Sequence, residues 1–433
     1  MALTGGSRRE AGLFVAAAAL ALVLGASTHL ARADEAEAPS RIVNPNERPE
    51  WTALYRERLA TWLKVQGPVP TYSPMEDVPG AGDRPLPLAE ATNRSIEATA
   101  LAKASAYAKA SQARAFIVWH KGKIQRADYF MGADRTTPIV SKSLSKPLAA
   151  IAVGRAIRLN NIRSLDQSAA DYIPEWRGTP KAGITIRYLL QMRSGLLEQS
   201  FTPDFEHPTT RAYLDPDHGW HIIHNYPLTD APGSRYGYSN AAADLIAVII
   251  ERATGQRYAE FVGREILQPI GATGGQIWID RPGGLAHSGC CMTMPAETWL
   301  RLAVLLAEGG KAGGQQLLDP SFVAQMAQGT AQNRHYGLGV WIAGPYVERR
   351  GFGGPGHPGP KVLHSRPYPD KALFLFDGNS NQVIYISPAT QTVILRVGDT
   401  PPEGFDWDNS LLPTLLLPAI QDEKTRSKLL PQS

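Results

Sequence analysis

The spacing of apolar positions predicts separate blocks of helix and strand along the chain. Apolar residues recur every three or four positions over the ranges 51–65, 88–110, 143–159, 186–192, 241–254, 258–267, 296–308 and 411–420, which predicts helices. Short β-branched or alternating runs predict strands at 115–120, 124–130, 337–342, 382–387 and 393–397. Strands therefore gather towards both ends of the chain, and helices fill the middle.

This distribution predicts an α+β fold. The tight turn Lys121-Gly122-Lys123 joins the first two strands into a hairpin. We expect residues 86–140 and 330–425 to form one antiparallel sheet flanked by helices, with a mostly helical lobe of residues 141–329 inserted between them. Residues 34–85, rich in Pro, Glu and Arg, are expected to form an N-terminal extension.

Residues 1–33 have the pattern of an export signal. Arg8 and Arg9 precede the apolar run 13–24, and Ala31-Arg32-Ala33 places small residues at the cleavage positions. An apolar run of about a dozen residues is too short to cross a bilayer of roughly 30 Å as a helix. We therefore expect a periplasmic or secreted protein with no stable membrane anchor after cleavage.

Composition indicates an ordinary globular chain: 43% of its 433 residues are hydrophobic and 19% are charged. The 44 basic and 40 acidic residues are mixed along the sequence without a basic block, which argues against nucleic acid as a partner. The only cysteines, Cys290 and Cys291, are neighbours and cannot build a disulfide framework. Simple burial of both thiols is the expectation.

A candidate nucleophile lies at the start of a predicted helix, in Ser143-Leu144-Ser145-Lys146. Three-residue spacing puts Ser143 and Lys146 on one helix face, where the lysine can activate the hydroxyl. The same helix start would supply unpaired N–H groups to a developing oxyanion. By composition alone, about one Ser-x-x-Lys is expected by chance in a chain of this length. A capped surface helix therefore remains the alternative.

A second candidate site is the turn 232–240, which contains Tyr238 and Asn240. A tyrosine here can accept a proton if a nearby lysine favours its ionised form, and the asparagine can hydrogen-bond that lysine or the substrate carbonyl. The alternative is that Tyr238 packs in the core and Asn240 caps the following helix.

The two motifs occur together with several further phrases: Ser164-Leu165-Asp166, the run 172–176, the run 184–190 leading to Ser194-Gly195-Leu196, and Glu308-Gly309-Gly310 with Leu317-Leu318. Over roughly residues 90 to 400 the chain resembles the serine β-lactamase-related hydrolases. That group includes class C β-lactamases, D-aminopeptidases, carboxylesterases and 6-aminohexanoate-dimer hydrolase. The resemblance implies a β-lactamase/D,D-peptidase-like fold and acylation of Ser143. It also implies that Lys146 and Tyr238 share the role of general base, with Asn240 beside them.

The chain departs from class C β-lactamases at the third motif. It has no Lys-Thr-Gly, whose lysine helps those enzymes hold an anionic substrate. Gly378-Asn379-Ser380 is the closest counterpart, and Asn379 or Ser380 could donate the second oxyanion N–H beside that of Ser143. A plain β-turn is an equal alternative. His357-Pro358-Gly359 ranks below Gly378 because the strand after it is poorly defined.

Other features give weaker indications. His218, His221 and His224 share one helical face, but a metal site there is disfavoured because no second-shell pattern accompanies them. They are expected to shape the cleft mouth instead. The 378–382 segment lacks the last glycine of a nucleophile elbow, so an α/β-hydrolase is not expected.

The sequence therefore favours an esterase or amidase acting on a small-molecule acyl substrate, without cofactor or metal. A β-lactamase or D,D-peptidase is the enzymatic alternative. A non-catalytic binding protein that retains the fold is the alternative of another class.

Overall fold

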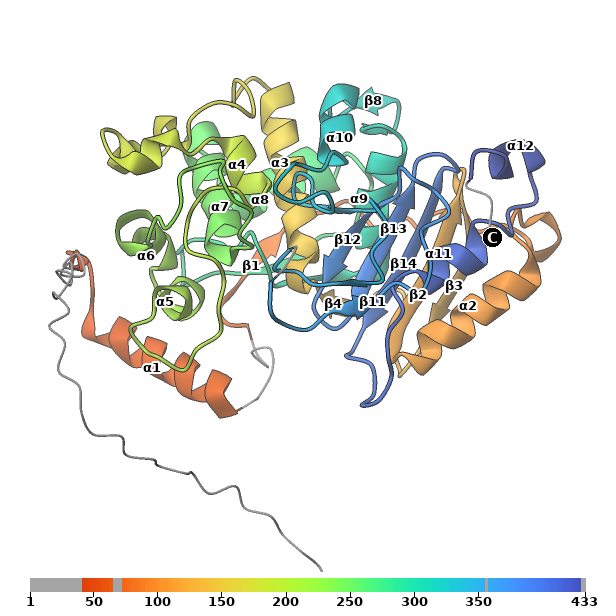
Figure 1. The fold of residues 1–433 in the computed structure, drawn as a ribbon, viewed down its shortest axis with the longest axis horizontal. Coiled ribbons are helices and arrows are strands. Elements are labelled where there is room, and N and C mark those ends of the chain that lie inside the picture. Colours follow the sequence, from red (N-terminus) through yellow and green to blue (C-terminus); the bar gives the residue numbers. More distant parts are fainter. Residues whose placement is uncertain (1–40, 65–71, 355–356, 430–433) are drawn as a thin grey trace, which may run out of the picture. The chain divides into compact units, whose positions relative to one another are not determined.

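The computed structural model describes residues 41–64, 72–354 and 357–429. The expected signal, residues 1–33, lies outside these ranges. The helices are α1 (Pro49–Lys64), α2 (Ala98–Ala110), α3 (Ser145–Arg158), α4 (Ile186–Leu190), α5 (Pro208–Leu214), α6 (His218–Asn225), α7 (Asn240–Thr254), α8 (Tyr258–Val262), α9 (Ala296–Ala307), α10 (Pro320–Met326), α11 (Leu411–Leu416) and α12 (Glu423–Arg426) (Figure 1).

The strands are short, and most belong to two sheets. They are β1 (Met75–Val78), β2 (Ala113–His120), β3 (Lys123–Tyr129), β4 (Pro138–Val140), β5 (Gly275–Trp278), β6 (Met292–Pro295), β7 (Lys311–Ala312), β8 (Gln315–Gln316), β9 (Trp341–Ile342), β10 (Arg349–Arg350), β11 (Val362–Leu363), β12 (Phe374–Gly378), β13 (Gln382–Ser387) and β14 (Thr392–Gly398).

The main sheet has six antiparallel strands in the order β3-β2-β14-β13-β12-β9. The first hairpin and the last three long strands are far apart in the sequence, and β2 pairs directly with β14. A sheet built from both ends of the chain was predicted, and this prediction is confirmed. The α+β fold class is confirmed with it.

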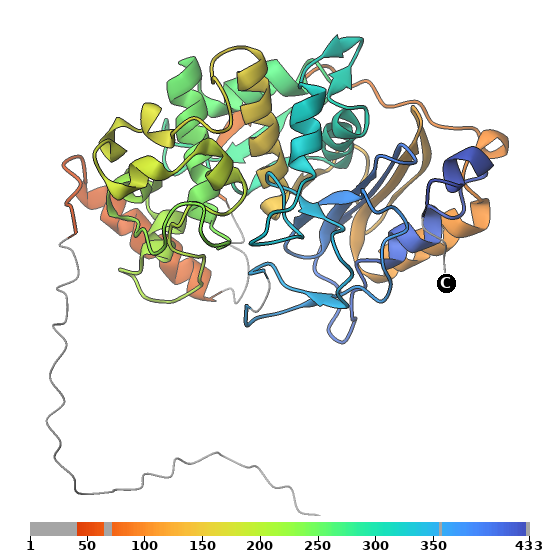
Figure 2. The same cartoon turned by 45° about the horizontal axis from the view of Figure 1, so that its top comes forward.

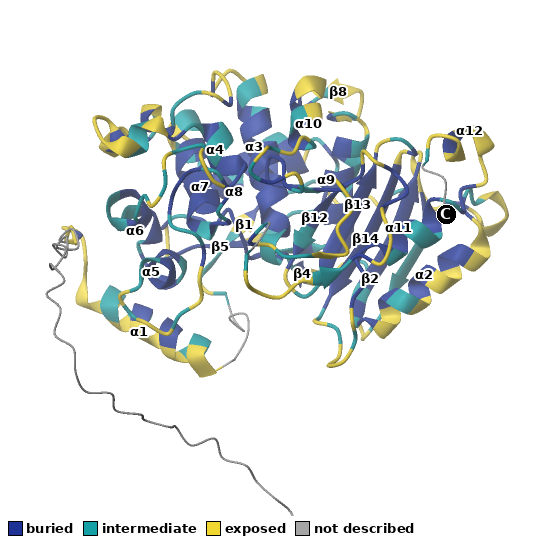
Figure 3. Ribbon diagram, in the orientation of Figure 1, coloured by how far each residue is buried: buried dark blue, intermediate teal, exposed yellow. Residues whose placement is uncertain are grey.

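Helices cover both faces of this sheet, which explains why its central strands are apolar throughout (Figures 1 and 3). Every residue of β13 and β14 is buried. On one face, Tyr385 and Ile394 share a core with α2 and α11; on the other, Ile384 and Leu395 belong to the large core that includes α9. Strands covered on both faces have continuous apolar runs instead of alternation.

A second sheet has the order β1-β5-β6-β4, and its two central strands, β5 and β6, lie within the part of the chain that was expected to be mostly helical. Its strands are three or four residues long. Runs this short carry too little periodicity to be recognised from sequence. The sheet matters for the site because β4 leads into the segment that carries Ser143, and β6 follows Cys291.

Several predicted boundaries were wrong. The helix predicted over 88–110 begins only at Ala98, because Leu88 instead bridges to Ile124 of β3. Within 337–342 only Trp341 and Ile342 form a strand, since Gly339 takes a left-handed φ of 70°. The helix predicted at 258–267 changes to a π-turn at Gly263, and that at 411–420 ends at Leu416.

The N-terminal extension is packed onto the rest of the chain. Helix α1 lies beside α5 (Figures 1 and 2), and buried Arg58 of α1 donates to the carbonyls of Leu214 and Asp280. Strand β1 is held by pairing with β5. Trp62 and Tyr72 of the extension line the cavity described below. Among the described residues, no helix is both long and apolar enough to cross a membrane.

Candidate active site

Ser143 lies in a single 3₁₀ turn, Lys142–Leu144, directly before α3. The Ser141 N–H donates to the Met292 carbonyl of β6, and the Ser141 hydroxyl accepts the Met292 N–H at 3.0 Å. The same hydroxyl contacts that of Ser145 at 2.7 Å. Lys142 has a φ of 50°, a left-handed conformation that is costly for a residue with a side chain. The surrounding structure therefore holds the nucleophile segment in one strained, defined position.

Lys146 and Tyr238 converge on the Ser143 hydroxyl. Lys146 Nζ donates to Ser143 Oγ at 3.2 Å, and the Tyr238 hydroxyl donates to the same atom at 3.0 Å. The ammonium also donates to Asn240 Oδ1 at 2.7 Å and to the Gly289 carbonyl at 2.9 Å. These contacts occupy all three donors of a lysine that is 3% exposed. The predicted one-face arrangement of Ser143 and Lys146 is present.

Tyr238 and Asn240 lie in the turn 232–240, and a capping residue at the start of α7 fixes the position of this turn. Ser239, not Asn240, caps this helix, because its hydroxyl accepts the N–H of Ala242. The alternative in which Asn240 serves as the cap is therefore wrong. Instead, the amide side chain of Asn240 is free to hold Lys146.

Gly378, at the end of β12, lies against the nucleophile. A Cβ at this position would stand 3.1 Å from the Ser141 carbonyl oxygen and 3.2 Å from the Ser143 nitrogen. A Cβ contact this short is tighter than most, so the absence of a side chain at Gly378 favours the close approach of the strand backbone. Beyond it, the Ser380 N–H donates to Asn379 Oδ1 at 2.6 Å, and the Ser380 hydroxyl accepts from Thr400. Of the two N–H groups predicted as oxyanion donors, that of Ser380 is therefore already engaged by the Asn379 side chain.

We expect Gly378→Val to lower kcat for ester hydrolysis by about 10²-fold or more, the cost of a displaced oxyanion donor. The added side chain must push apart the β12 end and the Ser143 turn. Steady-state kinetics measure this, with Gly82→Val as the matched control because a Cβ there meets nothing within 4 Å. A variant that keeps the wild-type kcat would show that this strand end takes no part in oxyanion binding.

Ser143 opens into a cavity of about 730 Å³. Aromatic and polar side chains from distant parts of the chain line it; those used below are Trp62, Tyr72, Lys142, Phe201, Tyr213, Tyr238, Asn240, Cys290, Cys291, Trp341, Arg350, Phe352, His364, Tyr368, Asp377, Gly378, Asn379 and Ser380. All the site residues predicted from the sequence except buried Lys146 are in this lining. Trp62 and Tyr72 come from the N-terminal extension, and Arg350 comes from β10.

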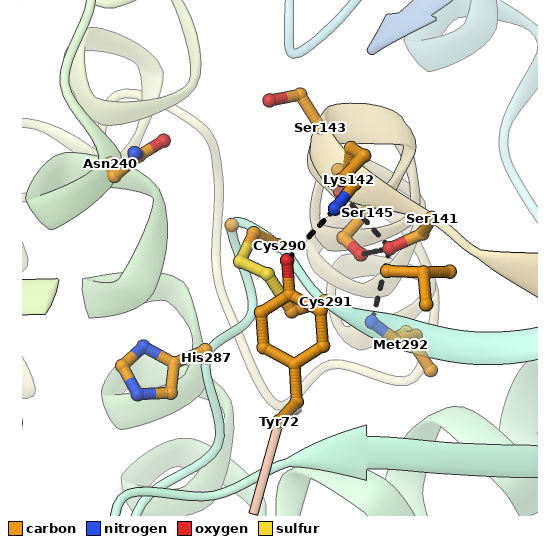
Figure 4. The surroundings of a disulfide bond; sticks show 12 residues. Tyr72, Ser141, Lys142, Ser143, Ser145, Asn240, His287, Cys290, Cys291 and Met292 are labelled. Atoms are coloured by element: carbon orange, nitrogen blue, oxygen red, sulfur yellow. Dashed lines mark hydrogen bonds between the residues drawn. A yellow bond between two sulfur atoms is a disulfide. The ribbon is translucent and has the colours of Figure 1, made fainter. Parts of the chain in front are cut away.

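Cys290 and Cys291 form a disulfide with each other in the cavity wall (Figure 4). The expectation of two simply buried thiols was wrong, because adjacency excludes a framework but not a bond between the neighbours themselves. The disulfide follows Gly289, whose carbonyl holds Lys146, and precedes Met292, which anchors the nucleophile turn. It therefore lies between a residue that holds Lys146 and one that holds the turn of Ser143.

Behind this wall, His218, Asp244 and His287 bring ligand-type atoms within 4.8 Å of one another. The His218 and His287 rings, however, are stacked with centroids 3.9 Å apart and planes 14° apart. A metal ion binds in the plane of an imidazole, so nearly parallel stacked rings do not direct their lone pairs to one ion. His218 Nδ1 instead contacts Asp280 at 2.9 Å, and His287 contacts Asp244 at 3.2 Å.

This buried cluster supports Lys146 through Gly289. Asp244 Oδ1 accepts the N–H of Gly289 at 2.8 Å, and the Gly289 carbonyl accepts from Lys146. Burial lowers the pKa of His287 to about 3, which keeps its ring neutral. His218, His221 and His224 are not among the cavity-lining residues, so the expectation that they shape the cleft mouth was wrong. His357 faces Glu198 instead of Ser143.

Comparisons with known proteins show which family the chain resembles. The β-lactamase family model matches residues 100–408. Esterase EstB of Burkholderia gladioli is 32% identical over 141 residues, covering 30% of this chain and 36% of EstB. The 6-aminohexanoate-dimer hydrolase of Paenarthrobacter ureafaciens is 24% identical over 229 residues, covering 50% of this chain and 57% of that enzyme. The matches thus span about a third to just over half of these relatives.

Solved structures share the fold. A Bacillus anthracis protein described as a candidate 6-aminohexanoate-dimer hydrolase superposes with a TM-score of 0.60 at 20% identity, covering 77% of this chain and 87% of that one. EstCE1, a hydrolase with promiscuous acyltransferase activity, gives 0.54 at 18% identity, covering 75% and 98%. Because the family model spans most of the chain, this protein belongs to the β-lactamase family, a family of serine hydrolases that includes esterases, amidases, β-lactamases and D,D-peptidases.

Proposed function

We propose that this protein is an exported serine hydrolase that forms an acyl-enzyme on Ser143 and acts on the ester or amide of a small acyl group. The observation that carries the proposal is the convergence of Lys146 Nζ and the Tyr238 hydroxyl on Ser143 Oγ, at 3.2 and 3.0 Å. Such contacts are what a serine needs to lose its proton as it attacks a carbonyl.

The reaction proceeds in two acyl-transfer steps. Ser143 Oγ attacks the substrate carbonyl while its proton passes to the Lys146–Tyr238 pair, one member of which must be deprotonated to accept it. The carbonyl oxygen becomes an oxyanion, held by the Ser143 N–H and the N–H of Asn379. The pair then protonates the departing alcohol or amine. Water attacks the acyl-enzyme by the same route in reverse and frees the acid.

Three observations support ester or linear amide substrates over β-lactams. The chain has no Lys-Thr-Gly; in its place the β12 strand ends in Gly378-Asn379-Ser380. The cavity wall is rich in aromatic side chains, which suit an apolar acyl or leaving group. Relatives include an esterase and a hydrolase of a linear amide dimer. Export rests on the pattern of residues 1–33.

Mass spectrometry of the intact protein tests this proposal. After brief exposure to a panel of p-nitrophenyl esters, linear amides and β-lactams, we expect an acyl adduct that digestion places on the peptide containing Ser143. Esters and amides should also turn over faster than nitrocefin. Rapid nitrocefin hydrolysis would reverse the substrate order. Absence of an adduct and of turnover with every compound would favour a binding protein instead.

A further inference from the structure

Two cationic side chains line the cavity without a carboxylate partner among the described residues: Lys142 and Arg350. Most arginines near the surface of this chain are paired with acids, for example Arg349, the neighbour of Arg350, with Asp406. Buried charges are ordinarily paired, because removing a charge from water is costly. Within the described part of the chain, buried Arg58 and Arg396 also lack an acid, but backbone carbonyls surround their guanidinium groups. Lys142 and Arg350 are half-buried and line a cavity, so a ligand can supply the negative charge there.

Arg350 has few partners for a side chain with five N–H donors. Its Nη1 donates to the Ile342 carbonyl at 3.2 Å, its guanidinium lies 5.7 Å from the centre of the Tyr368 ring, and its buried Nε has no hydrogen-bond partner. Burial lowers its pKa, yet a guanidinium stays protonated at neutral pH. Burial, together with the field of Arg350, lowers the pKa of His364 to about 4, so that ring is neutral.

Lys142 extends into the cavity beside the nucleophile. Its Nζ donates to the Tyr72 hydroxyl at 3.1 Å, next to the Cys290–Cys291 disulfide (Figure 4). Burial raises the pKa of Tyr72 to about 12, so this partner is a neutral phenol. The acid whose field reaches Lys142 is Asp399, and that carboxylate is engaged by Arg114 at 3.0 Å.

Asp377 is the one acid in the described cavity lining, and it does not pair with either cation. Its carboxylate accepts from Asn409 at 3.3 Å, and burial raises its pKa to about 7. At neutral pH the cavity is therefore positive even before Lys146 behind it is counted. The same cavity lining includes the aromatic side chains Trp62, Phe201, Tyr213, Trp341, Phe352 and Tyr368.

We propose that Lys142 and Arg350 form a carboxylate-binding subsite, so that the preferred substrate is an ester or amide with an apolar body and a carboxylate of its own. This inference rests on the proposed function. A planar guanidinium binds a carboxylate through two parallel hydrogen bonds, and the aromatic walls desolvate the pair. The subsite uses residues outside the β12 strand end, where Lys-Thr-Gly is missing.

Two matched pairs of substrates measure this preference. One pair puts the charge on the acyl part: the p-nitrophenyl monoester of suberic acid against p-nitrophenyl octanoate. The other puts it on the leaving group: 4-carboxyphenyl butyrate against its methyl ester. The readout is the ratio of kcat/KM for the charged ester to that for the neutral one. We expect a ratio above one in at least one pair.

The variant Arg350→Gln should lower that ratio about ten- to hundredfold, the usual range for losing one charge-assisted hydrogen bond. Arg349→Gln is the control, since Arg349 is exposed and pairs with Asp406, and it should leave the ratio unchanged. A wild-type ratio at or below one in both pairs, or a ratio unaffected by Arg350→Gln, would overturn the subsite. Failure to hydrolyse any of the four esters would instead count against the proposed function.

The pH dependence of the same kcat/KM ratio tests how much Lys142 contributes to carboxylate binding. Burial lowers the pKa of the Lys142 ammonium to about 8, so it is charged at pH 7 and loses its proton as pH rises towards 9. Asp377 ionises over an overlapping range, which also reduces the positive charge of the cavity. Tyr72 stays neutral and Asp399 stays paired. The ratio of kcat/KM for the charged ester to that for the neutral one should fall as pH rises from 7 to 9. In Lys142→Gln the fall near pH 8 should be smaller. An unchanged pH profile in that variant would exclude Lys142 from carboxylate binding.

Discussion

Replacement of Ser143 with alanine should abolish ester hydrolysis, lowering kcat/KM by at least about 10⁴-fold, and should prevent labelling by a fluorophosphonate probe. The hydroxyl of Ser143 is the atom on which Lys146 and Tyr238 converge, and alanine removes it while leaving both partners in place. The remaining oxyanion donors can still bind a carbonyl, so weak binding of substrate should survive. Hydrolysis rates and gel-based labelling measure the two effects.

Ser145 provides the matched control. It belongs to the same four-residue motif, but its hydroxyl contacts Ser141 and it is fully buried. Ser145→Ala should therefore remain labelled. Ser143 is only partly buried, so Ser143→Ala should unfold at nearly the wild-type temperature. Undiminished labelling of a folded Ser143→Ala protein would mean that another residue is the nucleophile.

The elements with strong local sequence signals could be predicted from the sequence. The hairpin around Lys121-Gly122 was predictable because a tight turn separates two β-rich runs, and β13 matches its predicted bounds of 382–387. The Ser143–Lys146 pairing was predictable because helical spacing alone decides it. Tyr238 and Asn240 needed the resemblance to a family, since the turn itself allowed a cap instead.

The remaining parts of the site depend on contacts between distant residues. Gly289 reaches Lys146 across 143 positions, and Tyr72 reaches Lys142 across 70. A single glycine or tyrosine is not part of a sequence motif that would predict a contact with a distant lysine. Strand β12 was missed because its five residues run directly into a turn, although it brings Gly378 to Ser143. The disulfide could have been suspected from the adjacent cysteines and the expected export.

Lys142 and Arg350 show a further limit of motif comparison. The sequence lacks Lys-Thr-Gly, and with it the lysine that helps class C β-lactamases to hold an anionic substrate. In the folded chain, cations enter the same cavity from the residue before the nucleophile and from β10. The charge of a cavity depends on all the residues that the fold brings to its walls. It therefore cannot be predicted from the sequence of one strand.

Replacement of Lys146 with methionine should lower the rate of acylation by about 10³- to 10⁴-fold, the contribution of a positioned acid–base group. Methionine fills a similar volume but cannot contact Ser143 Oγ, Asn240 Oδ1 or the Gly289 carbonyl as a donor. Tyr238→Phe removes one contact to Ser143 and should cost about 10²-fold. Single-turnover kinetics with a p-nitrophenyl ester measure acylation directly.

The double variant Lys146→Met/Tyr238→Phe separates shared from independent roles. If the two side chains handle one proton as a unit, removing the second after the first costs little, and the double variant should resemble Lys146→Met alone. The aromatic ring supports such coupling, because Lys146 Nζ lies 4.9 Å from the centre of the Tyr238 ring. Losses that multiply in the double variant would instead mean that lysine and tyrosine act in different steps, one in proton removal from Ser143 and the other in protonation of the leaving group.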